Sequence, residues 1–212
     1  MSAARTRRVL ILASASPRRR ALLKTFRIPF RVVEPRIDED HHERWAPARL
    51  VTRNATRKAE AVATRRSTGV ILSADTVVVL GGRYFGKPRD QQDARRMLRS
   101  LSGRTHRVYT GVCVIDLERR RRWVDVAITR VTMRAISAEE IAGYAADRTH
   151  RDKAGAYAIQ ELDRMVVDRV VGSLSNVIGL PLDLVERRLR QCGLLPAPGR
   201  PGVARRSTDA PR

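Results

Sequence analysis

The stretch Val70-Ile71-Leu72-Ser73-Ala74-Asp75-Thr76-Val77-Val78-Val79-Leu80 decides the fold. Its β-branched and apolar residues predict a strand inside a sheet. Gly81-Gly82 predicts a tight turn, and residues 83–85 the return strand of a hairpin. Asp75 is anomalous there, because Asp is disfavoured in strands and a buried carboxylate needs a partner. We favour a functional Asp75, which accepts a proton or holds Mg²⁺, over an Asp that caps neighbouring backbone.

Strands and helices alternate on both sides of this stretch. The apolar run at residues 9–13 predicts a strand buried on both faces, and Ser16 and Pro17 then begin a helix. The pattern predicts an α/β fold: a mixed sheet with flanking helices, in two lobes around a central cleft. Besides residues 9–13, 70–80 and 83–85, we expect strands at 30–34, 108–117, 123–133 and 165–171, and helices at 17–26, 47–65, 90–101, 137–147 and 182–191.

The composition indicates a folded domain with short extensions. The chain has 212 residues, of which 42% are hydrophobic, so it can build a core. We expect a basic N-terminal extension at residues 1–8, one domain at 9–194 and a disordered basic tail at 195–212, where Pro, Gly, Arg and Ser dominate. Cys113 and Cys192 fit free thiols in a reducing compartment. No apolar run has the length of a membrane span, so we expect a cytoplasmic protein.

The formal net charge is +21, which raises the question of nucleic-acid binding. Only 4% of the residues are aromatic, and the Arg residues are scattered along the chain, with one cluster at Glu118–Arg122 that we interpret as a solvated hairpin tip. An Arg-rich composition explains the charge as well. We therefore do not expect nucleic-acid binding as the main function.

Five cations are candidates for binding an anion. Arg18 and Arg19 fall in the first turn of a helix, where exposed N–H groups favour anions. Lys87 lies between the hairpin and a helix, and Lys153 begins a loop of small residues that lets backbone approach a ligand. Lys58 lies on the Ala-rich helix expected at residues 47–65. For each of them, a solvated surface charge is the alternative.

Several polar residues are less specific. The amide of Gln160 matches the acceptor–donor edge of uracil or thymine, although a bond to loop backbone is as common. Glu39 could supply a second carboxylate to a metal, or belong to an acidic surface loop. His41-His42 lack a third spaced ligand, so we predict no zinc site, and we expect a structural hydrogen bond from His106. The Walker A and dinucleotide glycine signatures are absent.

Seven segments together resemble the Maf family of nucleotide pyrophosphatases. They occur in the family's order and span residues 9–190. The segments are Ala13–Arg19, Arg57–Ala59, Ala74–Val78, Gly86–Pro88, Leu101–His106 with Thr110–Val112, Lys153–Gln160, and Gly172-Ser173 with Asn176–Pro181.

The resemblance implies an inosine-triphosphatase-like fold, a homodimer, a divalent metal (Mg²⁺ or Mn²⁺) and hydrolysis between the α- and β-phosphates. It implies that Asp75 is the catalytic proton acceptor. For the metal, the carboxylates that we expect to hold it are Glu39 and Asp75. Arg18, Thr76 and Gln160 match positions linked to substrate choice in the branch that hydrolyses dTTP and UTP. The nucleoside triphosphate substrate is expected to contact Ser14, Arg18, Arg19, Lys58, Thr76, Lys87, Lys153 and Gln160.

The chain departs from the family pattern at one position, and three other functions stay open. The family usually has Gly after the Gln, whereas this chain has Glu161, which makes base preference less secure than reaction type. A sister branch that prefers 7-methyl-GTP is one alternative. A non-catalytic regulator of cell division that senses nucleotides is another, and a nucleic-acid binder is the third.

Overall fold

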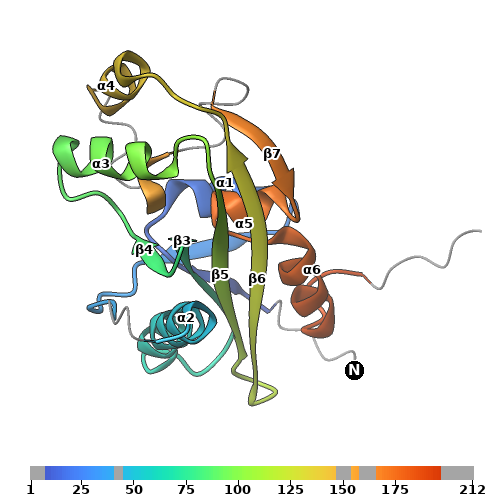
Figure 1. The fold of residues 1–212 in the computed structure, drawn as a ribbon. Coiled ribbons are helices and arrows are strands. Elements are labelled where there is room, and N and C mark those ends of the chain that lie inside the picture. Colours follow the sequence, from blue (N-terminus) through green and yellow to red (C-terminus); the bar gives the residue numbers. More distant parts are fainter. Residues whose placement is uncertain (1–7, 41–44, 147–153, 158–165, 197–212) are drawn as a thin grey trace, which may run out of the picture.

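Within the part of the chain that the structure describes, a mixed sheet of seven strands forms the centre of the molecule (Figure 1). The computed structural model describes residues 8–40, 45–146, 154–157 and 166–196. The strand order is β2-β1-β3-β5-β6-β7, with β4 paired to the end of β3. Strand β1 is parallel to β2 and β3, and the other pairs are antiparallel. The strands are β1 (Leu10–Ala13), β2 (Phe30–Val33), β3 (Val70–Leu80), β4 (Arg83–Phe85), β5 (Thr105–Asp116), β6 (Arg121–Met133) and β7 (Val167–Val171).

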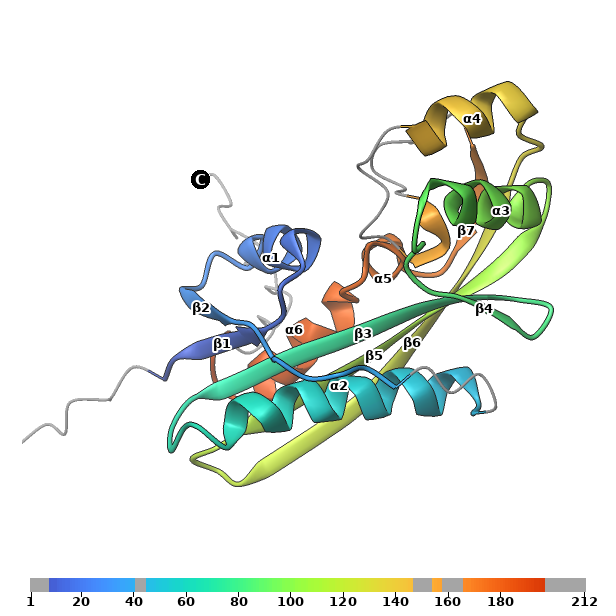
Figure 2. The ribbon, with the colours of Figure 1, turned by 90° about the vertical axis from the view of Figure 1, so that its left-hand side faces the viewer.

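Helices cover both faces of the sheet (Figure 2). Helix α2 (Pro47–Ala63) lies along one face, and α1 (Pro17–Lys24), α5 (Leu174–Ile178) and α6 (Leu182–Gln191) lie on the other. Helices α3 (Gln91–Leu101) and α4 (Ala138–Ala146) gather at the far end of the long strands, near β7. The structure therefore has flanking helices on both faces of a long mixed sheet, which is the arrangement that the sequence predicted.

The described residues form three apolar cores along β3. Two of them follow from the alternation of side chains between the faces of the strand. Even-numbered residues such as Leu72 pack with α1 and α6, whereas odd-numbered residues such as Ile71 pack with Ala55 and Ala59 of α2. Beyond Val78, a third core joins the strands to α3 and α4. The last core lies at the opposite end of β3 from β1, so apolar cores lie toward both ends of the long strands.

Gly111 lets α2 approach the sheet closely. It pairs with Asp75 across β5 and β3. A Cβ built at Gly111 would lie 2.4 Å from the carbonyl carbon and oxygen of Val51 and 2.6 Å from the backbone nitrogen of Thr52. Because no side chain fits there, the backbone of α2 lies directly against β5 beside Asp75.

Most predicted elements agree with the structure to within a few residues. The capping box of α4 is confirmed, since Ser137 and Glu140 exchange backbone-to-side-chain hydrogen bonds of 2.8 and 3.1 Å. The tip of the β5–β6 hairpin is exposed, as predicted. Helix α5 was not predicted, and neither was the short 3₁₀ turn at Ala154–Ala156. No helix in the described part of the chain is both long enough and apolar enough to cross a membrane.

Residues 1–7 and 197–212, which make up most of the two expected extensions, lie outside the described residues. Arg8 is described, and its guanidinium pairs with Asp116 of β5 and donates to the carbonyl oxygen of Cys192. This contact ties the start of β1 to the ends of β5 and α6. Cys113 and Cys192 are free and buried.

Candidate active site

A cavity opens where one edge of β3 lacks a neighbouring strand. On that edge β1 pairs with residues 70–72, and β4 pairs with residues 78–80. Among the described strands, none pairs with residues 73–77 on this side. The cavity at this gap has a volume of about 1150 Å³ and is lined from β3, α1, α2 and the β4–α3 connection. It is large enough for a nucleotide-sized ligand.

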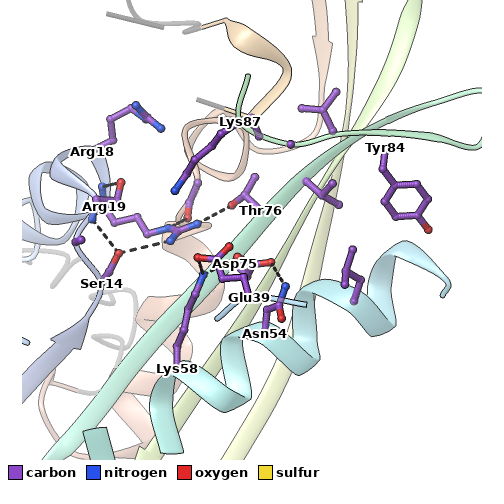
Figure 3. A pocket seen from close by; sticks show the side chains of 18 of the residues that line it. Ser14, Arg18, Arg19, Glu39, Asn54, Lys58, Asp75, Thr76, Tyr84 and Lys87 are labelled. Carbon is purple, nitrogen blue, oxygen red and sulfur yellow. Dashed lines mark hydrogen bonds and ion pairs between the residues drawn. The ribbon is translucent and has the colours of Figure 1, made fainter. Parts of the chain in front are cut away.

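Asp75 lies in the middle of this gap and is 7% exposed. Its Oδ1 accepts a hydrogen bond of 2.6 Å from Nζ of Lys58, and its Oδ2 accepts one of 3.1 Å from Nδ2 of Asn54 (Figure 3). Both partners come from α2, which Gly111 allows to pack at this point. The buried carboxylate therefore has the ionic partner that its position demands.

Lys58 holds two carboxylates together. Besides Asp75, its Nζ pairs with Oε1 of Glu39 at 2.8 Å. Burial raises the pKa of Glu39, but Lys58 first, and then Lys87 and Arg19, outweigh burial and keep that pKa below its usual value. Glu39 is thus an anion that faces several cations. Lys58, expected as a phosphate ligand, is in this structure a bridge between carboxylates.

Arg19 joins three segments at the other side of the cavity. Its Nε donates to the carbonyl oxygen of Gly179 at 2.8 Å, and its Nη2 donates to Oγ1 of Thr76 at 3.1 Å. A longer contact of 3.5 Å runs from its Nη1 to Oγ of Ser14. Burial lowers the pKa of Arg19, while the charges of Asp75 and Glu39 act in the opposite sense. The guanidinium stays charged and has a fixed orientation.

The turn before α1 forms as the sequence predicts. Ser16 is the N-cap, and its Oγ accepts from the backbone nitrogen of Arg19 at 3.4 Å. Oγ of Ser14 accepts from the backbone nitrogen of Ser16 at 3.2 Å. The turn follows the carboxyl end of β1, which is the edge where parallel strands present ligands. Arg18 and Lys87 also line the cavity (Figure 3).

The cavity brings together Ser14, Arg18, Arg19, Glu39, Lys58, Asp75, Thr76 and Lys87, all of which the sequence singled out. Lys153, Gln160, Glu161 and the His41-His42 pair lie outside the described residues. His106 makes the structural bond that was expected, because its Nε2 lies 2.7 Å from the hydroxyl of Tyr157.

The sequence did not identify Asn54 as part of the site. The signal was present, since Asn54 lies four residues before Lys58 and therefore shares its face of α2. A second polar group was also missed. Oγ1 of Thr110 lies 2.9 Å from that of Thr76 and donates to the carbonyl oxygen of Asn176 at 3.2 Å, so Thr76 is supported from β5 and α5.

The donor set suits a hard divalent cation. Glu39 and Asp75 each place one oxygen against the same ammonium group, so both face a common point that favours positive charge. Mg²⁺ typically uses one or two carboxylates together with water and substrate phosphates. Within the described residues, no group of three or more His, Cys, Asp or Glu is placed to hold a metal. The chemistry of the two carboxylates is therefore compatible with a divalent cation.

Comparison with known proteins gives a family and a fold. The family model described as Maf-like protein matches residues 9–192. A dTTP/UTP pyrophosphatase of Myxococcus xanthus is 48% identical over 192 residues, which cover 91% of this chain and 96% of the relative. A dTTP/UTP pyrophosphatase of Deinococcus radiodurans is 44% identical over 185 residues, covering 87% of this chain and 93% of the relative.

The solved structure of the Staphylococcus aureus Ham1 protein is similar to this chain in fold. The TM-score is 0.51 with 13% sequence identity, and the match covers 87% of this chain and 99% of that one. At this identity the likeness concerns the fold alone. It confirms the predicted fold class, a long mixed sheet with flanking helices.

Proposed function

Because the chain belongs to the Maf-like protein family, we propose that it hydrolyses dTTP and UTP to the monophosphate and pyrophosphate. Its curated relatives at 40–48% identity carry the name dTTP/UTP pyrophosphatase. One structural observation supports the reaction most strongly. A buried carboxylate, Asp75, lies in a nucleotide-sized cavity with Arg19, Lys58 and Lys87 around it.

The proposed chemistry begins with binding of the triphosphate by the cations of the cavity. Arg19 is oriented by Gly179 and Thr76, so it can meet phosphate oxygens without rearrangement. Lys87 is exposed and lines the same cavity, so it adds a further positive charge. These cations hold the phosphates and stabilise the charge that develops on the departing pyrophosphate.

Asp75 then acts on the attacking water. Each of its oxygens receives one hydrogen bond from α2, and a carboxylate oxygen can accept more than one. The remaining acceptor capacity orients a water molecule toward the α-phosphorus and takes its proton as the bond to phosphorus forms. The bond between the α-phosphorus and the bridging oxygen breaks, and pyrophosphate leaves.

A divalent cation is part of this proposal. Glu39 and Asp75 would hold Mg²⁺ or Mn²⁺, which would supply positive charge to the phosphate oxygens. Binding there would compete with Lys58 for the same carboxylate oxygens. Lys58 released from them would be free to meet phosphate, which reconciles its present contacts with the expected role.

The family resemblance also supports finer statements about this chain. Arg18 and Thr76 lie in the cavity and are proposed to contribute to substrate choice with Gln160. A homodimer is proposed on the same ground, and a cytoplasmic location is proposed because Cys113 and Cys192 are free thiols. Light scattering after size exclusion measures the mass in solution and distinguishes the 23.9 kDa monomer from a dimer.

The test is a panel of nucleoside triphosphates, including dTTP, UTP and 7-methyl-GTP, assayed for pyrophosphate with Mg²⁺ and with Mn²⁺. We expect the highest kcat/KM with dTTP and UTP. Preference for 7-methyl-GTP would assign the chain to the sister branch. Nucleotide binding without turnover would indicate a sensor, and polymer binding that weakens steeply with salt would indicate a nucleic-acid binder.

A further inference from the structure

Asn54 is a buried polar residue that no part of the reaction above uses. It lies on α2, lines the cavity and is only 2% exposed. Its Nδ2 donates to Oδ2 of Asp75 at 3.1 Å and to the carbonyl oxygen of Asp40 at 3.0 Å. Its Oδ1 accepts from the backbone nitrogen of Asp40 at 3.0 Å. One amide therefore joins α2, β3 and the acidic segment before α2. Figure 3 shows its contact with Asp75.

Toward Asp75, Asn54 completes a pair of donors. Lys58 holds one carboxylate oxygen, and Asn54 holds the other. A single donor would leave the carboxylate free to rotate about its last bond. Two donors on two different oxygens, both from one rigid helix, fix the carboxylate plane.

Toward Asp40, Asn54 fixes a neighbouring segment. The amide pairs with both backbone groups of Asp40, and the Asp40 carboxylate pairs with Arg53 and Arg57 at 2.8 Å each. Arg53, Asn54 and Arg57 all belong to α2. Glu39 precedes Asp40 directly, so the same anchoring sets the position from which Glu39 reaches Lys58.

Only an amide of this size can make these contacts. The three bonds require two N–H donors and one acceptor on a short side chain. An ionised Asp has no donor, and Leu has neither donor nor acceptor. Both substitutions preserve approximate size, so they separate the hydrogen bonds from the packing.

We propose that Asn54 is a positioning residue that orients the Asp75 carboxylate and places Glu39 beside it. This inference rests on the proposed function, because its consequence is a loss of turnover. Asn54→Leu should lower kcat for dTTP by about 10- to 100-fold, as is typical when a residue that orients a reacting group is removed. The KM should change by less than about threefold, because Arg19 and Lys87 are untouched. Asn54→Asp should lose at least as much kcat, since it places a third carboxylate beside Asp75 and Glu39.

The experiment compares Asn54→Leu and Asn54→Asp with a matched α2 variant in the full-length protein. Thr52→Ala removes a hydroxyl whose hydrogen bonds, within the described residues, run to carbonyl oxygens of its own helix. This control variant should keep kcat within about twofold of the parent protein. Binding of a non-hydrolysable α,β-methylene analogue of dTTP and the thermal midpoint are measured for every variant.

A fall in kcat at Asn54 with unchanged analogue binding supports the inference. Unchanged kcat per folded molecule, with only a lower thermal midpoint, overturns it and makes Asn54 a structural residue. An equal loss in Thr52→Ala overturns it as well. If Asn54→Leu does not fold, the turnover of the isosteric Asn54→Asp variant alone decides whether the inference holds. A parent protein that releases no pyrophosphate refutes the proposed function instead, so the two failures are distinguishable.

Discussion

Substitution of Gly111 by Ala should damage the active site through α2, which packs against Gly111 of β5 on the same face of the sheet as Asp75. The new Cβ would lie 2.4 Å from the backbone of Val51, whereas ordinary contacts begin at 3.4 Å. The clash is with helix backbone, so no side chain can turn away to relieve it. Helix α2 must therefore move from β5 by about 1 Å, or the strand must distort by a similar amount.

The displacement should lower both the turnover rate and the folding stability. A shift of about 1 Å would lengthen the Asp75 contacts to Lys58 and Asn54, now 2.6 and 3.1 Å, beyond good hydrogen-bond geometry. Misplacement of this size can cost about 100-fold in rate. Overpacking of this kind costs about 1–3 kcal/mol of folding free energy, which corresponds to a thermal midpoint lower by about 2–12 °C.

The assay measures pyrophosphate release from dTTP and thermal unfolding by circular dichroism. Gly143→Ala is the matched control, because Gly143 lies in α4 and a Cβ there meets nothing within 4 Å. That control should keep full turnover and gain up to about 1 kcal/mol from higher helix propensity. Gly111→Ala with unchanged turnover and midpoint would refute the claim that close packing of α2 builds the site.

Two further predictions concern single contacts. Arg19→Lys should raise the KM for dTTP about tenfold in steady-state assays, because an ammonium group cannot bond to Gly179 and Thr76 while it also contacts phosphate. An unchanged KM would show that Arg19 does not bind the substrate. Burial lowers the pKa of His106 from 6.5 to about 4, so its stabilising contribution is complete above pH 6.5 and is lost as the pH falls to about 4. His106→Gln should therefore flatten the pH dependence of the free energy of unfolding by about 3 kcal/mol across this window, and an unaltered slope in urea titrations would contradict this.

The elements that local patterns specify were predictable from the sequence. Strand β3 and helix α6 were predicted with the bounds that they have in the structure, because a long apolar run and a Pro181-led amphipathic segment identify them. Helix α5 was missed because its five residues are too few to show periodicity. Its cap residues, Ser173 and the left-handed Gly179, were the available signal.

The site was predictable in its residue types but not in its connections. Asp75 was identified because a carboxylate within an apolar strand must have a partner. The identity of that partner depends on which face of α2 meets β3, and this is set by the close approach at Gly111, a tertiary feature. For the same reason the contacts of Lys58 with two carboxylates could not be predicted, and the spacing of Asn54 four residues before Lys58 indicated only that they share a face of α2.

Turnover by Asp75→Asn tests the central claim most directly. The amide keeps the shape of the side chain but cannot take a proton from water, so pyrophosphate release from dTTP should fall by at least about 100-fold. The circular dichroism spectrum and binding of the α,β-methylene analogue should stay close to those of the parent protein. Near-normal turnover by this variant would contradict the assignment of Asp75 as the proton acceptor.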